Sequence, residues 1–134
     1  MANEHTLIVE YSSPIGFTCA NGTGIEKGAV LQMTDPMTAS AASAISQFPA
    51  GIAATEKIAS DGKTKIAVYR DGIFKGTCSG AIAIGDPIGT DVSNLISKAL
   101  TVSGCNVLGI ALETGANTET ILYELRPFGM LGMI

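Results

Sequence analysis

The chain contains two similar stretches in which a Gly-Ile-Ala segment is followed by a Glu, a polar turn and an alternating run. The first is FPAGIAATEKIASDGKTKIAVYRDG, residues 48–72, and the second is VLGIALETGANTETILYELRP, residues 107–127. Alternating runs separated by glycine-containing turns predict short β-strands, because successive side chains of a strand point to opposite faces. The two Asp-Gly pairs, at 61–62 and 71–72, are typical of β-hairpin turns.

The two stretches keep a nearly constant distance along the chain. Gly51 and Gly109 are 58 positions apart, and both are expected to let a neighbouring strand approach closely. Turns tolerate changes in length and strand registers do not, so this spacing favours a duplicated β unit, although two unrelated hairpins could also have become similar. The repeat is predicted to span residues 28–76 and 85–127. Two tyrosines are expected at matching places in it, with their rings packed in the sheet: Tyr69 and Tyr123.

Short segments between turns account for most of the remaining chain. Segments 28–35, 50–58 and 65–79 predict strands, whereas residues 37–47 predict a loop or a single helical turn, because Ser and Thr compete for backbone hydrogen bonds. Residues 95–104 fit either a pair of strands or a brief helix. About eight short strands at spacings near ten residues indicate an all-β fold. We therefore expect a compact sandwich or small barrel built from two similar β-hairpin units, with little helix.

The first 24 residues differ from the repeat. Leu7, Val9 and Tyr11 form a short alternating stretch, and few turns fix this segment locally. Residues 1–24 are therefore expected to form either an edge strand or an extended N-terminal arm that becomes ordered against a neighbour.

The end of the chain is apolar and uncharged. Residues 25–127 are expected to form the β domain, and residues 128–134 a tail that would expose adaptable apolar side chains if it stayed in water. The tail could fold back on its own barrel, but burial between subunits is the favoured interpretation. The candidate oligomer-interface residues are Phe128, Met130, Leu131, Met133 and Ile134.

Composition excludes several classes of protein. The formal net charge is -4 and no basic run occurs, so the Lys/Arg stripe of a nucleic-acid-binding protein is missing. The longest uncharged stretch, residues 36–55, contains Thr, Ser, Gln and Pro throughout and does not resemble a membrane span. The N-terminus lacks the basic region of a secretory signal. The three widely spaced cysteines are therefore expected to be reduced and mostly buried: Cys19, Cys78 and Cys105.

Few residues could perform catalysis or hold a cofactor. His5 is the only histidine and lies near an end expected to be mobile, so a Ser or Cys nucleophile has no well-placed base and a zinc site has no ligand set. Asp86 and Asp91 flank a Pro-Ile-Gly-Thr segment, and Asp35 precedes a proline in the first copy. These acids are interpreted as turn formers and not as a carboxylate pair or a calcium loop. The sequence predicts no enzyme and no cofactor.

The order of these elements resembles the small capsid decoration, or cement, proteins of tailed bacteriophages. That family has a Gly-x-Val strand, a Gly-Ile-Ala segment, a hairpin, an Ala-Ile-x-x-Gly-Asp step and a second Gly-x-Ala hairpin. The resemblance covers roughly residues 25–127. The corresponding segments here are Gly28–Leu31, Gly51–Ala53, Gly62–Gly72, Ala81–Ile88 and Gly109–Arg126.

The resemblance implies a structural virion protein, β-rich and often trimeric, made in the host cytoplasm. Such proteins bind the major capsid protein on the outside of an expanded capsid and clamp neighbouring capsomers against internal DNA pressure, often through N-terminal arms. The alternatives are a tail or fibre module, or a ligand-binding barrel with Asp86, Asp91 or Tyr123 in a pocket. The candidate capsid-contact residues are Leu7, Val9, Tyr11, Ile15 and Phe17.

Overall fold

The computed structural model describes residues 2–99 and 106–130. Within these ranges the chain forms β-strands and a single short 3-10 turn, which confirms the all-β prediction. The elements are β1 Thr6–Val9, β2 Ile15–Thr18, β3 Val30–Asp35, β4 Thr38–Ala41, β5 Pro49–Ala53, β6 Lys65–Tyr69, β7 Gly72–Thr77, β8 Pro87–Thr90, the turn η1 Val92–Asn94, β9 Ile96–Lys98, β10 Asn106–Ala111 and β11 Thr120–Met130.

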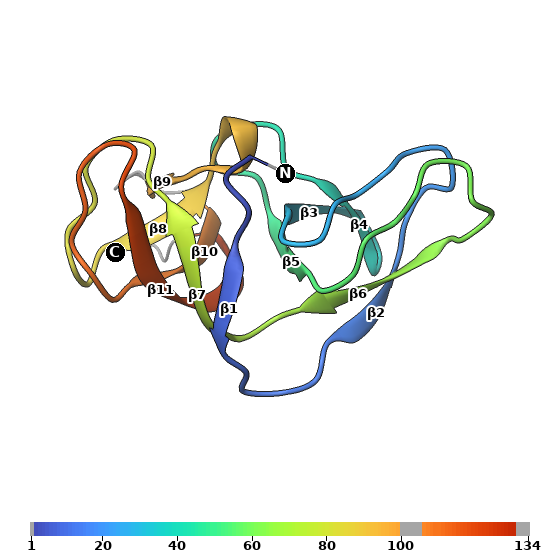
Figure 1. Ribbon diagram of the computed structural model, residues 1–134, viewed down its shortest axis with the longest axis horizontal. Coiled ribbons are helices and arrows are strands. Elements are labelled where there is room, and N and C mark those ends of the chain that lie inside the picture. The colour runs from blue at the N-terminus through green and yellow to red at the C-terminus, as the bar shows by residue number, and fades with distance from the viewer. Residues whose placement is uncertain (1, 100–105, 131–134) are drawn as a thin grey trace.

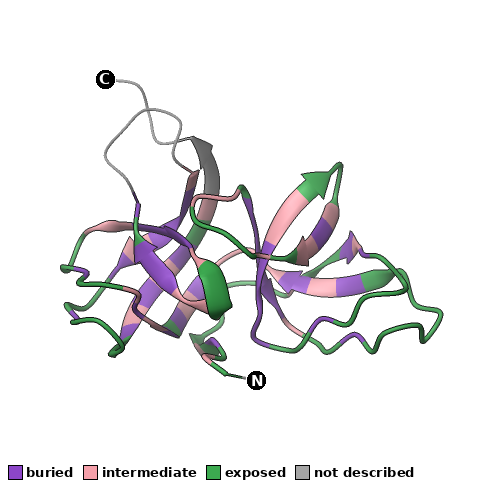
Figure 2. Ribbon diagram, turned by 90° about the horizontal axis from the view of Figure 1, so that it is seen from above, coloured by how far each residue is buried: buried purple, intermediate pink, exposed green. Residues whose placement is uncertain are grey.

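The strands form two bodies that lie side by side (Figure 1). Five strands close into a barrel in the order β2-β4-β3-β5-β6, and six form a sheet in the order β1-β7-β11-β10-β8-β9. The pairings are antiparallel except for the contact of β2 with β4, which closes the barrel. The long loops lie at the two far ends of the molecule, where most residues are exposed (Figure 2).

The two bodies repeat one strand arrangement. β2, β6, β5, β3 and β4 are neighbours in the barrel in the same order as β7, β11, β10, β8 and β9 in the sheet. Their hydrogen bonds recur as well: the Gly28 amide donates to the Ala53 carbonyl at 2.9 Å, and the Gly85 amide donates to the Ala111 carbonyl at 2.8 Å. The first unit therefore extends from β2 to β6 and the second from β7 to β11, with β1 added beside β7.

The tyrosines do not occupy matching places in these units, so that prediction is wrong. Ala53 pairs with Val68 in the first unit and Ala111 pairs with Tyr123 in the second, which makes Val68 the counterpart of Tyr123. The loop from β10 to β11 is shorter than the loop from β5 to β6, so the two final strands are offset. Tyr123 is consequently buried, whereas Tyr69 is only half-buried.

Two local predictions also fail. Asp71-Gly72 does not form a hairpin, because β6 pairs with β2 and β5 whereas β7 pairs with β1 and β11, so this turn leads from one unit to the other. The segment predicted as a loop or helical turn instead contains β4, which pairs with β3. Met37 takes a positive φ of 48° in the turn between them. Tertiary pairing overrides the weak local preference of the Ser/Ala sequence here.

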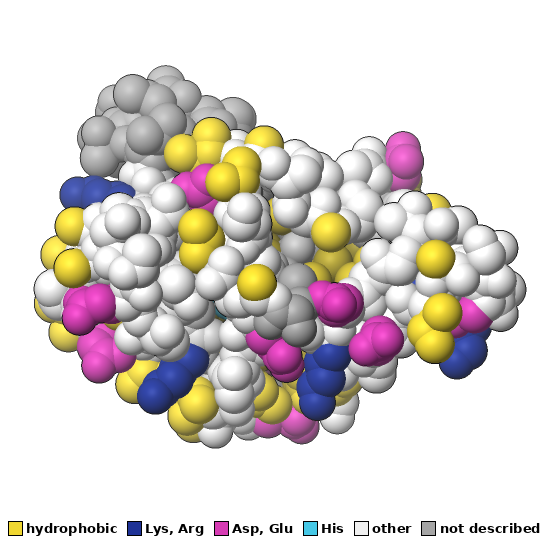
Figure 3. All heavy atoms as spheres, turned by 45° about the horizontal axis from the view of Figure 1, so that its top comes forward, with side chains coloured by type: hydrophobic (Ala, Val, Ile, Leu, Met, Phe, Trp, Pro, Cys, Tyr) yellow, Lys and Arg dark blue, Asp and Glu magenta, His cyan; other side chains and the backbone are white. Residues whose placement is uncertain are grey.

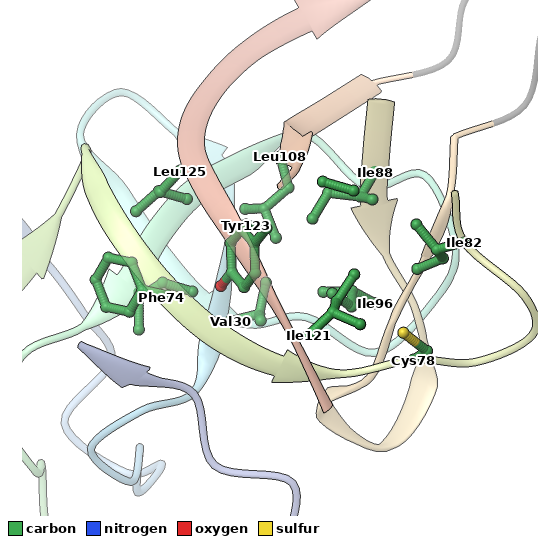
Figure 4. Packing of buried hydrophobic residues seen from close by; sticks show 12 residues of the cluster. Val30, Phe74, Cys78, Ile82, Ile88, Ile96, Leu108, Ile121, Tyr123 and Leu125 are labelled. Atoms are coloured by element: carbon green, nitrogen blue, oxygen red, sulfur yellow. The ribbon is translucent and has the colours of Figure 1, made fainter. Parts of the chain in front are cut away.

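The apolar residues form two cores, one inside the barrel and one in the second unit that also includes Val30 and Ile52 of the first. Glycines allow the strands to approach closely around them. Tyr123 and Phe74 stack with ring centroids 6.2 Å apart in the core of the second unit (Figure 4). A Cβ atom at Gly51 would overlap the carbonyl oxygen of Tyr69, and one at Gly109 would overlap that of Glu124. The predicted close backbone approach at both glycines is therefore confirmed.

Candidate functional site

The segment from the end of β1 to the start of β2 presents apolar side chains to water. It connects the sheet to the barrel along the lower edge of the molecule in Figure 1. Four large apolar residues within eight positions are between 43% and 49% exposed: Ile8, Val9, Tyr11 and Ile15. We call residues 8–15 the apolar ridge. Scattered apolar residues are normal on a protein surface, but a contiguous group of this kind is typical of an interaction site.

Three consecutive side chains hold the apolar ridge in one conformation. The Tyr69 hydroxyl donates to Glu10 Oε1 at 3.2 Å, and the Tyr11 hydroxyl donates to Glu124 Oε2 at 2.7 Å. The Ser12 hydroxyl donates to the Asp71 carboxylate at 2.8 Å. Exposed bonds of this kind add little stability because water competes for them. They connect the ridge to β6, to β11 and to the turn before β7.

Carboxylates surround the apolar ridge. Glu124 accepts the hydrogen bond of Tyr11 and also pairs with Arg126, whose Nε lies 2.9 Å from Glu124 Oε1. The hydrogen bond to Glu124 raises the pKa of Tyr11, so this phenol stays neutral. Glu10 and Asp71 extend the acidic border along the ridge. A surface that fits this border would be apolar with basic residues at its edge.

The buried side chain of His5 anchors the start of β1, the strand that leads into the apolar ridge. Its imidazole is buried between β7 and η1, where Nε2–H donates to the Asn94 carbonyl at 2.9 Å and Nδ1 accepts from the Tyr123 hydroxyl at 2.6 Å. A Cβ atom at Gly76 would lie 2.6 Å from the ring, so glycine leaves the space that the imidazole fills. Burial lowers the pKa of His5 to about 4, although the bond to Asn94 opposes this shift. The expectation that His5 lies near a mobile end is wrong.

The acids proposed as turn formers bond to nearby backbone. Asp86 Oδ2 accepts from the Ala83 amide at 2.9 Å, and Asp91 Oδ1 accepts from the Val92 amide at 2.7 Å. Among the described residues no group of His, Cys, Asp and Glu side chains has the arrangement of a metal site. No helix in the described part of the chain is long and apolar enough to cross a membrane. On the face in Figure 3 the Lys and Arg side chains lie apart from one another.

A comparison with protein families identifies this architecture. A family model described as phage cement protein matches residues 10–126, which include the apolar ridge from Glu10 onward and both β units. The chain belongs to the phage cement protein family. Members of this family are structural and non-enzymatic, so the chain has a structural role in the virion and associates with the capsid.

A solved structure shares the fold of this cement protein. The chain is similar to the N base of the head fibre gp8.5 of bacteriophage phi29, with a TM-score of 0.57 and 16% sequence identity. The similarity covers 89% of this chain and 98% of that chain. Identity at this level shows a common fold and no more. No curated protein is significantly similar in sequence.

The predicted contact residues fall into three places in this cement protein. Val9, Tyr11 and Ile15 are exposed on the apolar ridge, Leu7 is half-buried against the core of the second unit, and Phe17 is only 1% exposed inside the barrel. The backbones of Phe128 and Met130 belong to β11. The remaining tail residues lie outside the described part of the chain: Leu131, Met133 and Ile134.

The sequence reasoning missed Ile8 as a ridge residue. Strict alternation along β1 would place Ile8 on the face opposite Leu7 and Val9. The pairing of β1 with β7 shifts register between Leu7 and Val9, so this alternation is interrupted and both Ile8 and Val9 are exposed. A bulge cannot be read from an apolar run of three residues, and no other signal in the sequence marks it.

Proposed function

We propose that this cement protein binds the outer surface of the expanded capsid through the apolar ridge and clamps neighbouring capsomers. The observation that carries the proposal is the set of exposed side chains on the ridge, Val9, Tyr11 and Ile15, held in place by hydrogen bonds to carboxylates. A preordered apolar surface binds with a smaller entropy cost than a flexible arm. The partner is the major capsid protein, which would offer an apolar surface bordered by basic residues.

The clamp follows from mass action. A protein that binds the expanded shell but not its precursor stabilises the expanded state by the free energy of binding. Several ridges on one homotrimer would bind the same shell together, and the high effective concentration of the second and third ridges would raise occupancy. The proposal involves no nucleic acid, membrane or cofactor.

Co-sedimentation with expanded and unexpanded shells tests the proposal. We expect the wild type to pellet with expanded shells only, and the double variant Val9→Glu/Tyr11→Glu to remain in the supernatant because two carboxylates join an acidic border. A matched control is Ile84→Glu, which adds a charge at a residue that is 67% exposed but lies in the loop before β8. Equal pelleting of the wild type and the ridge variant would rule out the ridge as the shell contact.

A fibre component is the second candidate. The similar fold of the phi29 head fibre base supports it, since that protein belongs to a fibre on the phage head. In that case the ridge would still contact the shell, but one site of the trimer would hold a fibre. Electron microscopy of purified particles distinguishes the two: a low, regular layer over the shell supports the clamp, and projections from the shell support the fibre base.

A further inference from the structure

Two sets of hydrogen bonds, at different places, join the two units of the chain. The loop at residues 42–48 of the first unit reaches the second unit, where the Gln47 amide donates to Thr90 Oγ1 at 2.9 Å. Asn106 Nδ2 donates to the Ser46 carbonyl at 2.8 Å, and the Asn106 amide donates to Ser46 Oγ at 3.2 Å. Thr90 and Asn106 therefore form the part of the second unit that contacts the loop at residues 42–48 of the first.

The turn between β8 and β9 forms the other half of this junction. Asn94 Oδ1 accepts from the Val30 amide at 2.7 Å, and Asn94 Nδ2 donates to the Gly28 carbonyl at 3.1 Å. The tip of the second unit is thus inserted against the start of β3 in the first. Thr90, Asn94 and Asn106 are the side chains of the second unit that make these hydrogen bonds, beside the apolar core in which Val30 and Ile52 of the first unit pack.

The strand pairings show which residues of the first unit correspond to these three. Leu31 pairs with Ala41 and Gly51 in the barrel, as Ile88 pairs with Lys98 and Gly109 in the sheet. The turn residues match in conformation too, since Met37 and Asn94 both have positive φ, at 48° and 61°. The counterparts are Met33 for Thr90, Met37 for Asn94 and Phe48 for Asn106.

All three counterparts are apolar where the junction residues are polar. Met37 is 49% and Phe48 is 39% exposed, while Met33 is partly buried. Met33 and Phe48 line a shallow hollow of about 320 Å³ together with residues 34–36. The turn that holds Met37 joins β3 to β4, and the Thr18 amide of β2 donates to the Met37 carbonyl at 2.7 Å. We call Met33, Met37 and Phe48 the hairpin face.

We propose that the hairpin face is the surface on which a second copy of this chain docks, in a head-to-tail contact. Two of the three positions that correspond to the junction residues, Met37 and Phe48, are exposed in the first unit, so a contact at the same place can form with another molecule. Apolar residues suit this role, because methionine and phenylalanine gain free energy when a partner covers them. A head-to-tail contact joins two different surfaces and closes into a ring when the rotation between copies allows it, as in a trimer.

This inference rests on the oligomer of the proposed function and not on the shell contact. The hairpin face lies on β3, the β3–β4 turn and the residue before β5, whereas the apolar ridge extends from the end of β1 to the start of β2. The two surfaces can therefore be changed separately.

Light scattering after size-exclusion chromatography tests the inference on the full chain without capsid. We expect the wild type to run as a discrete oligomer and the double variant Met37→Glu/Phe48→Glu to run at the mass of one chain. The matched control, Ile58→Glu, places a carboxylate at a residue that is 63% exposed in the loop after β5 and should keep the wild-type mass. Circular dichroism should be the same for all three, since the replaced side chains are largely exposed.

The inference is overturned if the wild type is a monomer at micromolar concentration, or if the hairpin variant keeps the wild-type mass. Dissociation of the control would overturn it as well, because the effect would then come from charge and not from this face. The ridge variant Val9→Glu/Tyr11→Glu separates the two proposals. This variant should keep the oligomeric mass but no longer bind the shell. The mass of the hairpin variant therefore tests the inference even if the ridge proves not to contact the shell.

Discussion

Neutral His5 should make the stability of this cement protein depend on pH between 6.5 and about 4. The imidazole is buried, donates from Nε2 to the Asn94 carbonyl and accepts at Nδ1 from the Tyr123 hydroxyl. A proton on Nδ1 would face that hydroxyl hydrogen and place an uncompensated charge in the core. Tyr123 cannot offset the charge by ionising, because burial raises its pKa well above 10.0.

The pKa of His5 sets the sign and the size of the effect. Above pH 6.5 the imidazole is neutral in the folded and unfolded chains, and its contribution to stability is fully present. As the pH falls from 6.5 to about 4, the unfolded chain binds a proton that the folded chain does not, so the free energy of unfolding decreases. The total loss is about 3 kcal/mol, from roughly 1.4 kcal/mol for each pH unit between the two values.

Urea unfolding followed by circular dichroism at neutral pH, near pH 5 and near pH 4 measures this loss. The variant His5→Phe is the comparison, because its ring can fill the space beside Gly76 but cannot titrate. Carboxylates contribute the same pH dependence to both proteins. We expect the wild type to lose about 3 kcal/mol more than the variant over this range. Parallel pH dependence in the two proteins would show that His5 is not buried in its neutral form.

Three further predictions concern the fold. Gly51→Ala should lower the free energy of unfolding by about 3 kcal/mol or more in urea titrations, because its Cβ would overlap a backbone carbonyl oxygen. Phe17→Ala should cost about 3 to 5 kcal/mol in the same assay, because this ring is in the core of the barrel and not on a contact surface. Asn94→Ala should cost about 1 to 3 kcal/mol, because it leaves the Val30 amide without an acceptor and removes one of the two donors to the Gly28 carbonyl.

Each of these predictions has its own control. Gly62 also has a positive φ but has open space around it, so Gly62→Ala should cost much less than Gly51→Ala; equal losses would contradict the argument from close approach. If the Phe17→Ala variant were stable but no longer bound shells, Phe17 would belong to the contact surface and not to the core. Asn94→Asp keeps an acceptor for the Val30 amide and should lie between wild type and Asn94→Ala.

Much of the fold could be predicted because its signals are local. Alternating runs and glycine turns indicated an all-β chain, and the two Gly-Ile-Ala phrases led to the close backbone approach at Gly51 and Gly109. Which strands pair is a long-range property, and local signals gave it only in part: β5 pairs with β6 and β10 with β11 as predicted, but β6 does not pair with β7. Asp71-Gly72 has the sequence of a hairpin turn, yet β6 and β7 each find a better partner in their own unit. The offset of Tyr69 from Tyr123 is also a long-range effect. A change in loop length shifts the register of the following strand, and the sequence of that strand does not reveal the shift.

The surface proposed to contact the shell was predicted in part. Val9, Tyr11 and Ile15 were identified from a short apolar run near the N-terminus, and they lie on the apolar ridge. The carboxylates that order the ridge come from residues far along the chain, such as Glu124 and Asp71, and no spacing rule connects them to Tyr11 and Ser12.

The sequence by itself determined the class of fold, the small inventory of reactive residues and the apolar character of the N-terminal segment, because these depend on residue type and on neighbours in the chain. Only the tertiary structure decided that His5 is buried and hydrogen-bonded and that Phe17 is in the core. It also decided that Met33, Met37 and Phe48 correspond to residues that join the two units. The physical reason is that burial and pairing arise between segments that are distant in sequence. A side chain is part of the core or of a surface according to what folds against it.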